Sequence, residues 1–586
     1  MSGIGLILNS AKDALLTHQY AINVISHNIT NVNTPGYSRQ TALINAKTPA
    51  PYGGFVFGRG VELNDILRQN NNFIETRLQQ RKSALMAMSE KEAYLSVMEG
   101  IFNENSELSL GNQFSNFFNS WNDLANAPSG LSERNVVYEY GALLSQSFGN
   151  FETDLAQLNQ SLSLSIDTAV KRVNQLSSQI ADLNEQVFNL GAYGDANDLK
   201  DHRDTLLKEL SEYIDISTHE DPEGHITLTT SSGYTLVNKT TTYQLSFSGG
   251  NIKWEGSGGG EVDITDKITG GKLGGWLDMR DEIIPKYRAE FSELAKSVIW
   301  EVNKIHSLGV GLEGFSSVTG TYDADTPAGA LDNSGLAYQD LITDGDFKFW
   351  VYDSSGNVID MGGAGGALVV AIDKDVTSIN DIEAALDGLD GGNISANVAS
   401  DGKLTITASN GRTFAFSEDD SHVLAAMGIN TFFTGDDAAG MGMNAMLETR
   451  PELIAAAKVA PAGGEFAVGD SSNALDMIDL QYQNVTLKRW TYERGVAGTS
   501  QDVSNSFENY YHYFVGSIGI TSQSIGREKG YSEVVVNQLT DKRNNISAVS
   551  IDEEMTDLIK FQHAYSAAAK LVTTANEMLQ ELLNLK

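Results

Sequence analysis

Two amphipathic helical patterns, one at each end of the chain, constrain the fold more than any other sequence feature. In the N-terminal pattern, residues recur at alternating spacings of four and three: Ile4, Leu8, Ala11, Leu15, His18, Ile22, Ile25, Ile29 and Val32. The C-terminal pattern has the same spacings: Leu558, Phe561, Tyr565, Ala568, Val572, Ala575, Leu579 and Leu582. Heptad spacing is typical of helices that pack on another helix. At 1.5 Å per residue both helices reach roughly 40 to 50 Å, so we expect that they pair along their length.

Local signals predict where these helices end and begin. Proline disfavours helix for the residue before it, and Pro35 with Gly36 suits the centre of a type II turn. We therefore expect the first helix to end near residues 31–33. Ser550 and Glu553 predict a capping box before the last helix, with Ser550 as N-cap and Glu553 bonding back to it.

The rest of the chain alternates between helical and strand periodicity. Helical spacing dominates residues 64–210 and 276–308, and it returns over residues 474–520. Residues 213–268 change to a period of two, which predicts a small β unit. Residues 309–469 are rich in Gly and Asp and carry short apolar runs such as 347–352, which predicts a β-rich domain inserted between helices.

The predicted fold class is therefore α+β and multidomain, with long coiled-coil-forming terminal helices, a helical body with a small β unit, and an inserted β-rich outer domain. We expect three domains. The terminal helical assembly domain contains residues 1–63 and 541–586, and the helical body contains residues 64–312 and 470–540, with the β unit at about 213–270. The outer domain contains residues 313–469.

Charge and cysteine content exclude several classes of function. The 586 residues carry a net charge of -36, which repels nucleic acid and anionic membranes. With no cysteine, thiol nucleophiles and disulfides are excluded, and the chain can cross between redox compartments without mispairing. The first residues lack a basic n-region, and no run of about 18 apolar residues occurs, so we expect neither a cleaved signal peptide nor membrane insertion.

Two motifs that suggest ligand binding have a simpler structural interpretation. Gly309, Gly311 and Gly314 match the dinucleotide spacing G-x-G-x-x-G, but a helix precedes them and a loop over residues 315–325 is expected to follow, which reverses the required context. The potential metal ligands His219, Glu220, Asp221, Glu223 and His225 surround a turn sequence, Asp221-Pro222-Glu223-Gly224, and lack a zinc spacing. We expect a helix exit at the first motif and a hairpin turn at the second.

A calcium-loop interpretation also fails. Asp323, Asp325 and Asp332 are acidic, but an EF-hand would need Gly at Ala328 and Glu at Ser334, so only a weak surface cation site remains open. His18 lies within the N-terminal pattern and is expected to be a helix-interface residue. We find no candidate catalytic, cofactor or metal residues and predict that the chain is not an enzyme.

The two ends also carry a family resemblance. Residues 28–37, Asn-Ile-Thr-Asn-Val-Asn-Thr-Pro-Gly-Tyr, resemble the N-terminal motif of the flagellar axial proteins, the family of rod, hook and hook-associated subunits. Residues 550–583 are similar to the C-terminal helix of that family. The similarity to hook-associated members extends to three further segments: residues 36–40, 302–309 and 549–555.

The resemblance implies a structural subunit at the junction between flagellar hook and filament. It implies export through the flagellar type III apparatus, with a transient cytoplasmic stage, a chaperone at the C-terminal helix, and a final extracellular location. The implied partners are further copies of the chain, the hook protein and a second junction protein. The residues expected to form the assembly interface are Ile4, Leu8, Leu15, Ile22, Ile25, Ile29, Leu558, Phe561, Tyr565, Val572, Leu579 and Leu582.

Two alternatives remain open at this stage. Another axial protein, such as a hook subunit or the second junction subunit, would share both end motifs. A secreted adhesin or surface-degrading enzyme would place its function in residues 315–469, although no active-site residues there support it.

Overall fold

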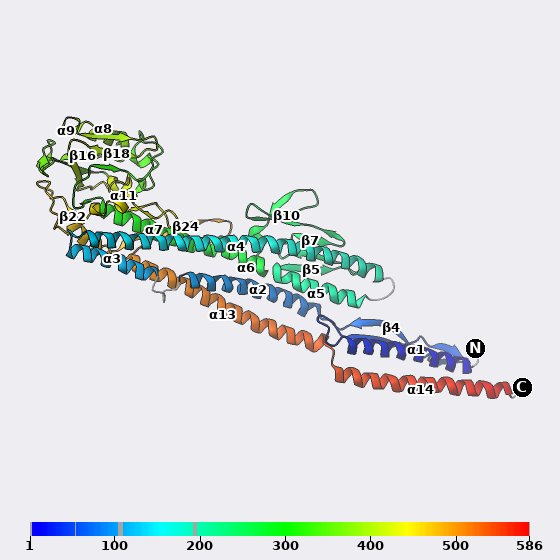
Figure 1. Ribbon diagram of the computed structural model, residues 1–586. Coiled ribbons are helices and arrows are strands. Elements are labelled where there is room, and N and C mark those ends of the chain that lie inside the picture. The colour runs from blue at the N-terminus through cyan, green and yellow to red at the C-terminus, as the bar shows by residue number, and fades with distance from the viewer. Residues whose placement is uncertain (1–2, 53, 103–108, 192–195, 585–586) are drawn as a thin grey trace. The chain divides into compact units, whose positions relative to one another are not determined.

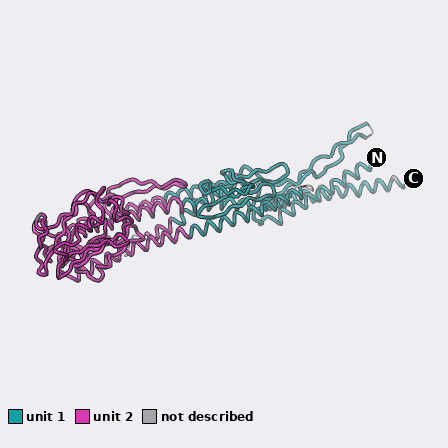
Figure 2. Tube along the Cα trace, turned by 90° about the horizontal axis from the view of Figure 1, so that it is seen from above, with its two compact units in different colours: residues 1–94, 161–279, 523–586 teal, residues 95–160, 280–522 magenta. Residues whose placement is uncertain are grey.

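A computed structural model describes residues 3–52, 54–102, 109–191 and 196–584. The chain forms two compact units, each built from segments that are distant in sequence. Unit 1 contains Met1–Tyr94, Ser161–Met279 and Gln523–Lys586, and unit 2 contains Leu95–Gln160 and Arg280–Ser522 (Figure 2). Both units mix helices and antiparallel strands, which confirms the predicted α+β multidomain class.

Unit 1 is mainly helical and includes both ends of the chain (Figure 1). Its helices are α1 (Gly3–Thr30), part of α2 (Asn72–Ile101), part of α4 (Leu131–Gly191), α5 (Asn197–Tyr213), α6 (Gly271–Asp278), part of α13 (Phe507–Ser547) and α14 (Ile551–Asn584). The first helix ends at Thr30, next to the limit that the Pro-Gly turn predicts.

The predicted small β unit is present in unit 1 as two antiparallel sheets. One has the order β5 (Ile216–Glu220), β6 (Ile226–Thr230), β7 (Thr235–Asn238) and β8 (Thr241–Thr242). The other has the order β11 (Glu261–Asp263), β10 (Asn251–Glu255) and β9 (Leu245–Ser248). In β6, Ile226, Leu228 and Thr230 are buried and alternate with half-buried residues, as the period of two predicts. They join one core with apolar residues of α4 and α5.

A long β ribbon follows α1, where the sequence predicted no strands. β1 (Gln40–Ala46) pairs with β4 (Val61–Arg68), and β2 (Ala50–Tyr52) pairs with β3 (Phe55–Phe57). The prediction of helix from residue 64 is therefore wrong over β4, and the expected terminal domain is not purely helical. The alternation of Val61 and Leu63 with Glu62 and Asn64 was the available signal for the strand.

Unit 2 combines a helical part with the β-rich segment. Its helices are α3 (Leu110–Asn126), α7 (Ile284–His306), α8 (Ile379–Leu386), α9 (Leu389–Gly392), α10 (Val423–Ala426), α11 (Ala445–Thr449) and α12 (Ser472–Asp479), with the remaining parts of α2, α4 and α13. A π-helical segment, Met279–Ile283, directly precedes α7.

The strands of unit 2 form small antiparallel groups. In the largest group, β14 (Gly345–Tyr352) pairs with β15 (Val358–Ile359), β16 (Leu368–Ile372) and β19 (Thr413–Ser417). In a second group, β18 (Leu404–Ala408) lies between β13 (Ser317–Thr319) and β17 (Ile394–Val398). Three pairs complete the set: β12 (Gly309–Val310) with β22 (Ala457–Lys458), β20 (Phe433–Thr434) with β21 (Gly442–Met443), and β23 (Val485–Glu493) with β24 (Val496–Asn505). The apolar run 347–352, predicted as a strand, lies in β14.

The predicted helix over residues 474–520 is wrong between α12 and α13, where β23 and β24 form a hairpin. Val485 and Leu487 are buried and alternate with exposed Thr486 and Lys488, which is strand periodicity. Gly495 has a φ of +73°, which suits the turn between the strands. The backbone N–H of Trp490 also donates to the buried Glu290 on α7 at 3.2 Å, so tertiary contacts support the hairpin.

Candidate assembly interface

The terminal helices α1 and α14 lie side by side and antiparallel within unit 1 (Figure 1). The ring of His18 on α1 lies 5.9 Å from that of Phe561 on α14, centroid to centroid. Burial lowers the pKa of His18, and its Nδ1 is buried with no hydrogen-bond partner among the described residues. His18 is thus a helix-interface residue, as predicted.

The two predicted stripes contribute unequally to this pair. In the N-terminal stripe, Ile25 is buried, Leu8 is exposed, and the other predicted residues are half-buried, namely Ile4, Leu15, Ile22 and Ile29. In the C-terminal stripe Leu558, Phe561 and Val572 are half-buried, and Tyr565 and Leu579 are exposed. The side chain of Leu582 lies outside the described residues. Most of the stripe residues thus keep part of their apolar surface outside the helix pair.

Further apolar side chains on both helices remain uncovered in the single chain. Each of the following is at least 38% exposed: Ile7, Leu8, Leu16 and Tyr20 on α1, and Ile551, Met555, Ile559, Tyr565, Leu571, Met578, Leu579 and Leu583 on α14. Large exposed apolar side chains that gather on one pair of helices are a candidate interaction site in a soluble protein. Leu8, Tyr565 and Leu579 belong to the predicted stripes, whereas the other nine residues lie off them and were not identified by the sequence patterns.

Asn28 connects the N-terminal motif to the start of α14. Its side-chain NH2 donates to Glu554 Oε2 at 2.9 Å and to the carbonyl of Gln40 at 2.8 Å. Its Oδ1 accepts from the N–H of Gln40 at 3.0 Å and from the hydroxyl of Tyr37 at 2.8 Å. Asn28 is 1% exposed, so this amide satisfies donors and acceptors from two segments in the interior.

Arg39 makes the second connection between the ends of the chain. Its Nε donates to Glu554 Oε1 at 2.7 Å, and one terminal nitrogen donates to Glu553 Oε2, also at 2.7 Å. Its backbone N–H donates to the carbonyl of Ser547 at 2.8 Å. We call Asn28, Tyr37, Arg39, Gln40 and Glu554 the motif junction. It joins residues that the family resemblance identified in two separate segments.

The predicted turn and cap lie beside the motif junction. Gly36 has a φ of +83°, and the N–H of Tyr37 donates to the carbonyl of Thr34 at 3.2 Å, as expected of a type II turn around Pro35 and Gly36. α14 begins at Ile551, directly after Ser550. A capping box would need the Glu553 carboxylate to accept from the backbone N–H of Ser550, but this carboxylate accepts from Arg39. The capping box therefore stays a prediction.

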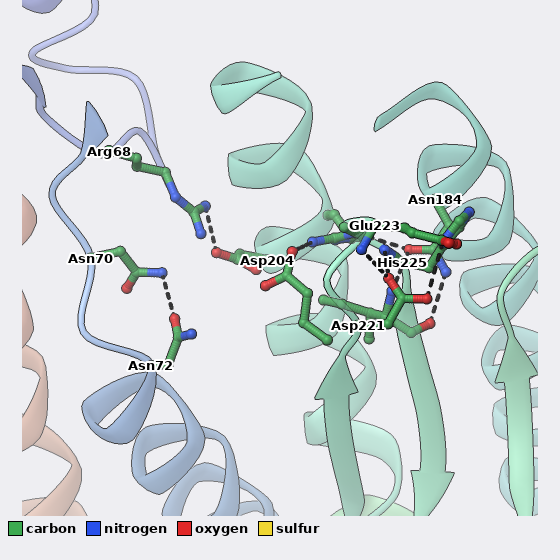
Figure 3. Close-up of polar contacts among 12 residues, drawn as sticks. Arg68, Asn70, Asn72, Asn184, Asp204, Asp221, Glu223 and His225 are labelled. Carbon is green, nitrogen blue, oxygen red and sulfur yellow. Dashed lines mark hydrogen bonds and ion pairs between the residues drawn. The ribbon is translucent and has the colours of Figure 1, made fainter. Parts of the chain in front are cut away.

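Acidic residues of α5 form hydrogen bonds with Ser38 and Arg68, near the N-terminal motif. The N–H of Ser38 donates to Asp201 Oδ2 at 2.8 Å, and Arg68 donates to Asp201 Oδ1 at 3.0 Å. Arg68 also donates to Asp204 Oδ2 at 2.7 Å (Figure 3). Burial raises the pKa of Asp204 although Arg68 opposes that shift. Burial, together with the charges of Asp198, Asp201 and Glu554, raises the pKa of Tyr37, so its hydroxyl remains a proton donor to Asn28.

A second set of motif residues organises unit 2. Asn303 Oδ1 accepts from the backbone N–H groups of Phe432 and Phe433, both at 2.9 Å. His306 is fully buried; its Nδ1 lies 2.8 Å from the carbonyl of Asn430, and its Nε2 accepts from the N–H of Ala455 at 3.1 Å. Residues 302–309 thus bind the backbone of the β-rich segment, a role that no sequence pattern indicated.

The glycines after α7 are explained by close packing. A Cβ on Gly311 would lie 2.1 Å from the carbonyl oxygen of Glu452, and one on Gly309 would lie 2.2 Å from the side chain of Asn473. Gly309 is in β12, and no helix occurs in the described residues 311–330. The helix exit is confirmed, although β13 occupies part of the expected loop at residues 315–325.

The predicted hairpin turn at residues 221–225 is also present. The N–H of Asp221 donates to the carbonyl of His225 at 2.9 Å, and Gly224 has a φ of +88°. His225 Nδ1 lies 3.3 Å from Asp221 Oδ2 and 3.7 Å from Glu223 Oε2 (Figure 3). The ammonium of Lys239 lies 3.2 Å from Glu223, so a side chain already supplies positive charge to these carboxylates.

Two of the other candidate ligands are paired with basic side chains. Glu220 accepts from Arg203 at 2.9 Å, and Asp323 pairs with Lys403 at 2.8 Å. Within the described parts of the chain, no helix is long and apolar enough to cross a bilayer.

Comparison with protein families gives three matches. Residues 8–37 match the flagella basal body rod protein family, residues 95–320 the flagellar hook-associated protein FlgK helical domain, and residues 542–585 the C-terminal family of the flagellar basal body rod FlgEFG proteins. The first and third matches contain Asn28, Tyr37 and Glu554 of the motif junction, and the second contains Asn303 and His306.

Individual relatives agree with these matches. The chain is 26% identical to flagellar hook-associated protein 1 of Escherichia coli K12, over 99% of this chain and all of that protein. It is 26% identical to the Bacillus subtilis protein of the same name, over 98% of this chain and 97% of that protein. The flagellar hook protein FlgE of Caulobacter vibrioides is 55% identical over 40 residues, 7% of each chain.

A solved structure is also similar. The flagellar hook junction protein FlgK from Burkholderia pseudomallei matches with a TM-score of 0.48 and 16% identity, covering 81% of this chain and all of that one. The families that match this chain are structural flagellar families and not enzyme families. The chain is therefore similar to the flagellar rod and hook families at its two ends and to hook-associated protein 1 along nearly its whole length.

Proposed function

We propose that this chain is the structural subunit that joins the flagellar hook to the filament. As a flagellar axial protein it is part of the flagellum, an extracellular appendage that is built from associating axial subunits. The full-length similarity to hook-associated protein 1 supports the junction in particular.

The observation that carries the mechanism is the uncovered apolar surface of the α1–α14 pair. Fully burying a side chain such as Leu or Ile stabilises a protein by about 1.5 to 3 kcal/mol. The exposed residues of α14 alone offer several such contributions to a neighbouring subunit. We infer that the paired terminal helices pack on further copies of the chain, on the hook protein and on a second junction protein.

In this proposal each expected domain has its own role. Residues 1–63 and 541–586 act as the assembly domain, residues 64–312 and 470–540 as the body, and residues 313–469 as the outer domain. Before assembly the chain leaves the cytoplasm through the flagellar type III apparatus. A cytoplasmic chaperone covers the apolar face of α14 until then, so chaperone and neighbouring subunits compete for one surface.

Deletion of the gene tests the junction role. The expected result is cells with hooks but without filaments, and flagellin released into the medium, seen by electron microscopy and by analysis of secreted protein. Normally filamented cells would contradict the proposal.

A second candidate function is that of a hook subunit. The 55% identity to the Caulobacter hook protein favours it, but that similarity covers only 40 residues. The same deletion separates the two functions, because loss of a hook subunit removes the hook itself.

A further inference from the structure

One face at the start of α2 carries exposed aromatic and basic side chains. Phe73 is 68% exposed, and Arg77 and Arg81 follow it at intervals of four residues and are also exposed. Residues four apart on a helix are neighbours on one face, so these three side chains form a row. We call them the α2 row. At 1.5 Å per residue the row is about 12 Å long.

Neither arginine of the α2 row pairs with a carboxylate in the described parts of the chain. Arg77 Cζ lies 5.5 Å from the centroid of the Phe73 ring, and the guanidinium of Arg77 donates to Gln80 at 3.4 Å. Residues 76–89 contain three basic residues, Arg77, Arg81 and Lys82, and no acidic residue. The positive charge of the row is therefore available to an acidic partner.

The ion pairs next to the α2 row leave its surroundings positive. Glu75 pairs with Lys208 and with Arg543, both at 3.1 Å, and Glu212 pairs with Lys82 at 2.5 Å. These pairs contain three cations and two anions, and the arginines of the row add two cations, which leaves an excess of three positive charges. The whole chain has a net charge of -36, so this face attracts the acidic surface of another copy.

The first part of α14 carries a second exposed row with the same spacing. Ile551, Met555 and Ile559 are four residues apart and are 51%, 43% and 52% exposed. We call them the α14 row. Its length equals that of the α2 row because both rows span the same number of residues on a helix. Both rows lie in unit 1, and the single chain leaves both uncovered.

Charge is distributed unevenly along the α14 row. The exposed residues Asp552 and Glu553 follow its first residue, whereas Lys560 follows its last. Glu553 is paired with Arg39, but Asp552 has no basic partner in the described parts of the chain. Lys560 lies 3.5 Å from Asp557, and its side chain is 71% exposed. The row therefore begins at an acidic end and finishes beside a cation.

We propose that the α2 row of one copy packs antiparallel on the α14 row of a second copy. This orientation places Arg81 beside Asp552, where opposite charges attract. It places Phe73 beside Ile559 and Lys560, so the ring contacts an apolar side chain and a cation. The parallel orientation would instead bring Arg81 to Lys560, and these like charges repel.

The contact is heterologous, because the α2 row and the α14 row are different surfaces of the chain. Every copy can therefore offer one row to each of two neighbours, and such contacts continue around a ring or along a helical array instead of closing a dimer. The inference rests on the proposed assembly function and adds to it the surface that covers the first part of α14.

Disulfide trapping tests this contact without background, because the natural chain has no cysteine. Two full-length proteins, Gln80→Cys and Met555→Cys, are mixed and oxidised; Gln80 is exposed next to Arg81, so the α2 row itself stays intact. The control pair is Gln80→Cys with Ser257→Cys, an exposed position in the turn between β10 and β11. The first pair is expected to form the mixed dimer at least about tenfold faster, because docking raises the effective concentration of the two thiols.

Exchange of charges tests the antiparallel orientation. Arg81→Glu in the Gln80→Cys protein is expected to slow the mixed cross-link by about tenfold, because two acidic groups then meet. Asp552→Arg in the Met555→Cys partner is expected to restore the rate, because the exchanged pair attracts again. Lys171→Glu in place of Arg81→Glu is the control with the same change in net charge, since Lys171 is 70% exposed on α4, and it should leave the rate unchanged.

Four results would overturn the contact between the rows. One is equal cross-linking rates for the two cysteine pairs. Another is an intrachain disulfide in a dilute Gln80→Cys, Met555→Cys double variant, because the α14 row would then reach the α2 row of its own chain. A third is cross-linking of Gln80→Cys to a single-cysteine hook subunit but not to Met555→Cys. The fourth is a rate that Asp552→Arg fails to restore, which would contradict the antiparallel orientation.

Incorporation into the flagellum distinguishes failure of this contact from failure of the assembly proposal. Ile559→Asp alters the exposed face of α14 and leaves the α2 row intact. If the cross-link is absent but Ile559→Asp still prevents incorporation, α14 assembles on another surface and only the contact with the α2 row is wrong. If Ile559→Asp assembles normally, the assembly proposal itself is wrong.

Discussion

Glu554 is the residue at which the polar contacts between the two ends of the chain meet. Its carboxylate accepts from Asn28 and Arg39 and is 1% exposed, whereas the adjacent Glu553 bonds to the same arginine with its side chain 63% exposed. Removal of one partner from a buried charged pair is costly because the other charge is left uncompensated. An exposed pair contributes little.

Glu554→Ala should therefore lower the free energy of unfolding by about 3 kcal/mol. Glu553→Ala is the matched control and should change it by less than about 1 kcal/mol. Urea unfolding of the two purified variants, followed by helix content, measures both changes. Equal effects would show that Glu554 is not the centre of the junction.

His306 gives unit 2 a dependence on pH. Burial lowers the pKa of His306 from 6.5 to about 4, and its Nε2 must stay unprotonated to accept from Ala455. The unfolded chain takes up a proton below pH 6.5 while the folded chain does not, so stability is lost as the pH falls from about 6.5 to about 4, by about 3 kcal/mol in total.

Replacement of His306 should remove this contribution. Thermal unfolding of His306→Gln is expected to begin at a lower temperature at pH 7 and to show a smaller loss between pH 7 and pH 4.5 than the natural chain. His512→Gln, at a half-exposed position on α13, serves as control and should keep the natural pH dependence. An unchanged pH dependence in His306→Gln would contradict the assignment.

The sequence predicted individual residues well only where a local pattern involved them. The Pro35–Gly36 turn and the interface position of His18 follow from neighbours within a few residues. The motif junction could not be predicted from periodicity, because Asn28 and Glu554 are separated by 526 positions and each looks like an ordinary polar residue on a helix. Only the family resemblance of the two segments marked them.

At the scale of elements, the α1–α14 pair depends on small residues at its contact. Ala568 and Ala575 on α14, which packs on α1, are at most 4% exposed. Small side chains at these positions let the two helices approach closely, while the larger stripe residues flank the contact and stay half-buried.

Ala575→Leu should therefore separate the helices. Added methylene groups in a packed contact destabilise by about 1 to 3 kcal/mol. Ala567→Leu, on the exposed side of α14, is the matched control and should have little effect, since leucine is nearly as good a helix former as alanine. Urea unfolding followed by circular dichroism compares them. Similar midpoints for the two variants would rule out close packing at Ala575.

Long helices were predicted well because their periodicity extends over many turns, as in α1, α4 and α14. The two-stranded ribbons, in contrast, could not be predicted from the sequence pattern. The β1–β4 ribbon and the β23–β24 hairpin are short patterns next to strong helices, and their pairing is fixed by contacts such as that of Trp490 with Glu290, which no local window contains. The β-rich segment was predicted as a class, but its strand order was not.

For the whole molecule, charge and apolar surface act in opposite directions on assembly. A net charge of -36 keeps separate copies apart, whereas we propose that the exposed apolar residues of α1 and α14 bring copies together. Salt screens the repulsion, and the Debye length falls from about 10 Å at 0.1 M to about 3 Å at 1 M.

Association of the purified chain should therefore be faster at high ionic strength. Light scattering at about 0.05 M and about 0.5 M NaCl is expected to show faster growth at the higher concentration, because the Debye length shortens. Leu579→Asp should abolish growth at both concentrations, and Gln580→Asp, an exposed neighbour with the same charge change, should retain it. Faster growth at low salt would mean that attraction between charges dominates.

The most direct measurement of the central claim is incorporation of an α14 variant into the flagellum of a cell that lacks the natural gene. Ile559 is 52% exposed on α14, and Gln562 is exposed on the same helix, so Ile559→Asp and Gln562→Asp add the same charge at an apolar and a polar position. Electron microscopy and motility assays are expected to show filaments with Gln562→Asp and bare hooks with Ile559→Asp. Normal filaments and motility with Ile559→Asp would contradict assembly through the exposed face of the terminal helices.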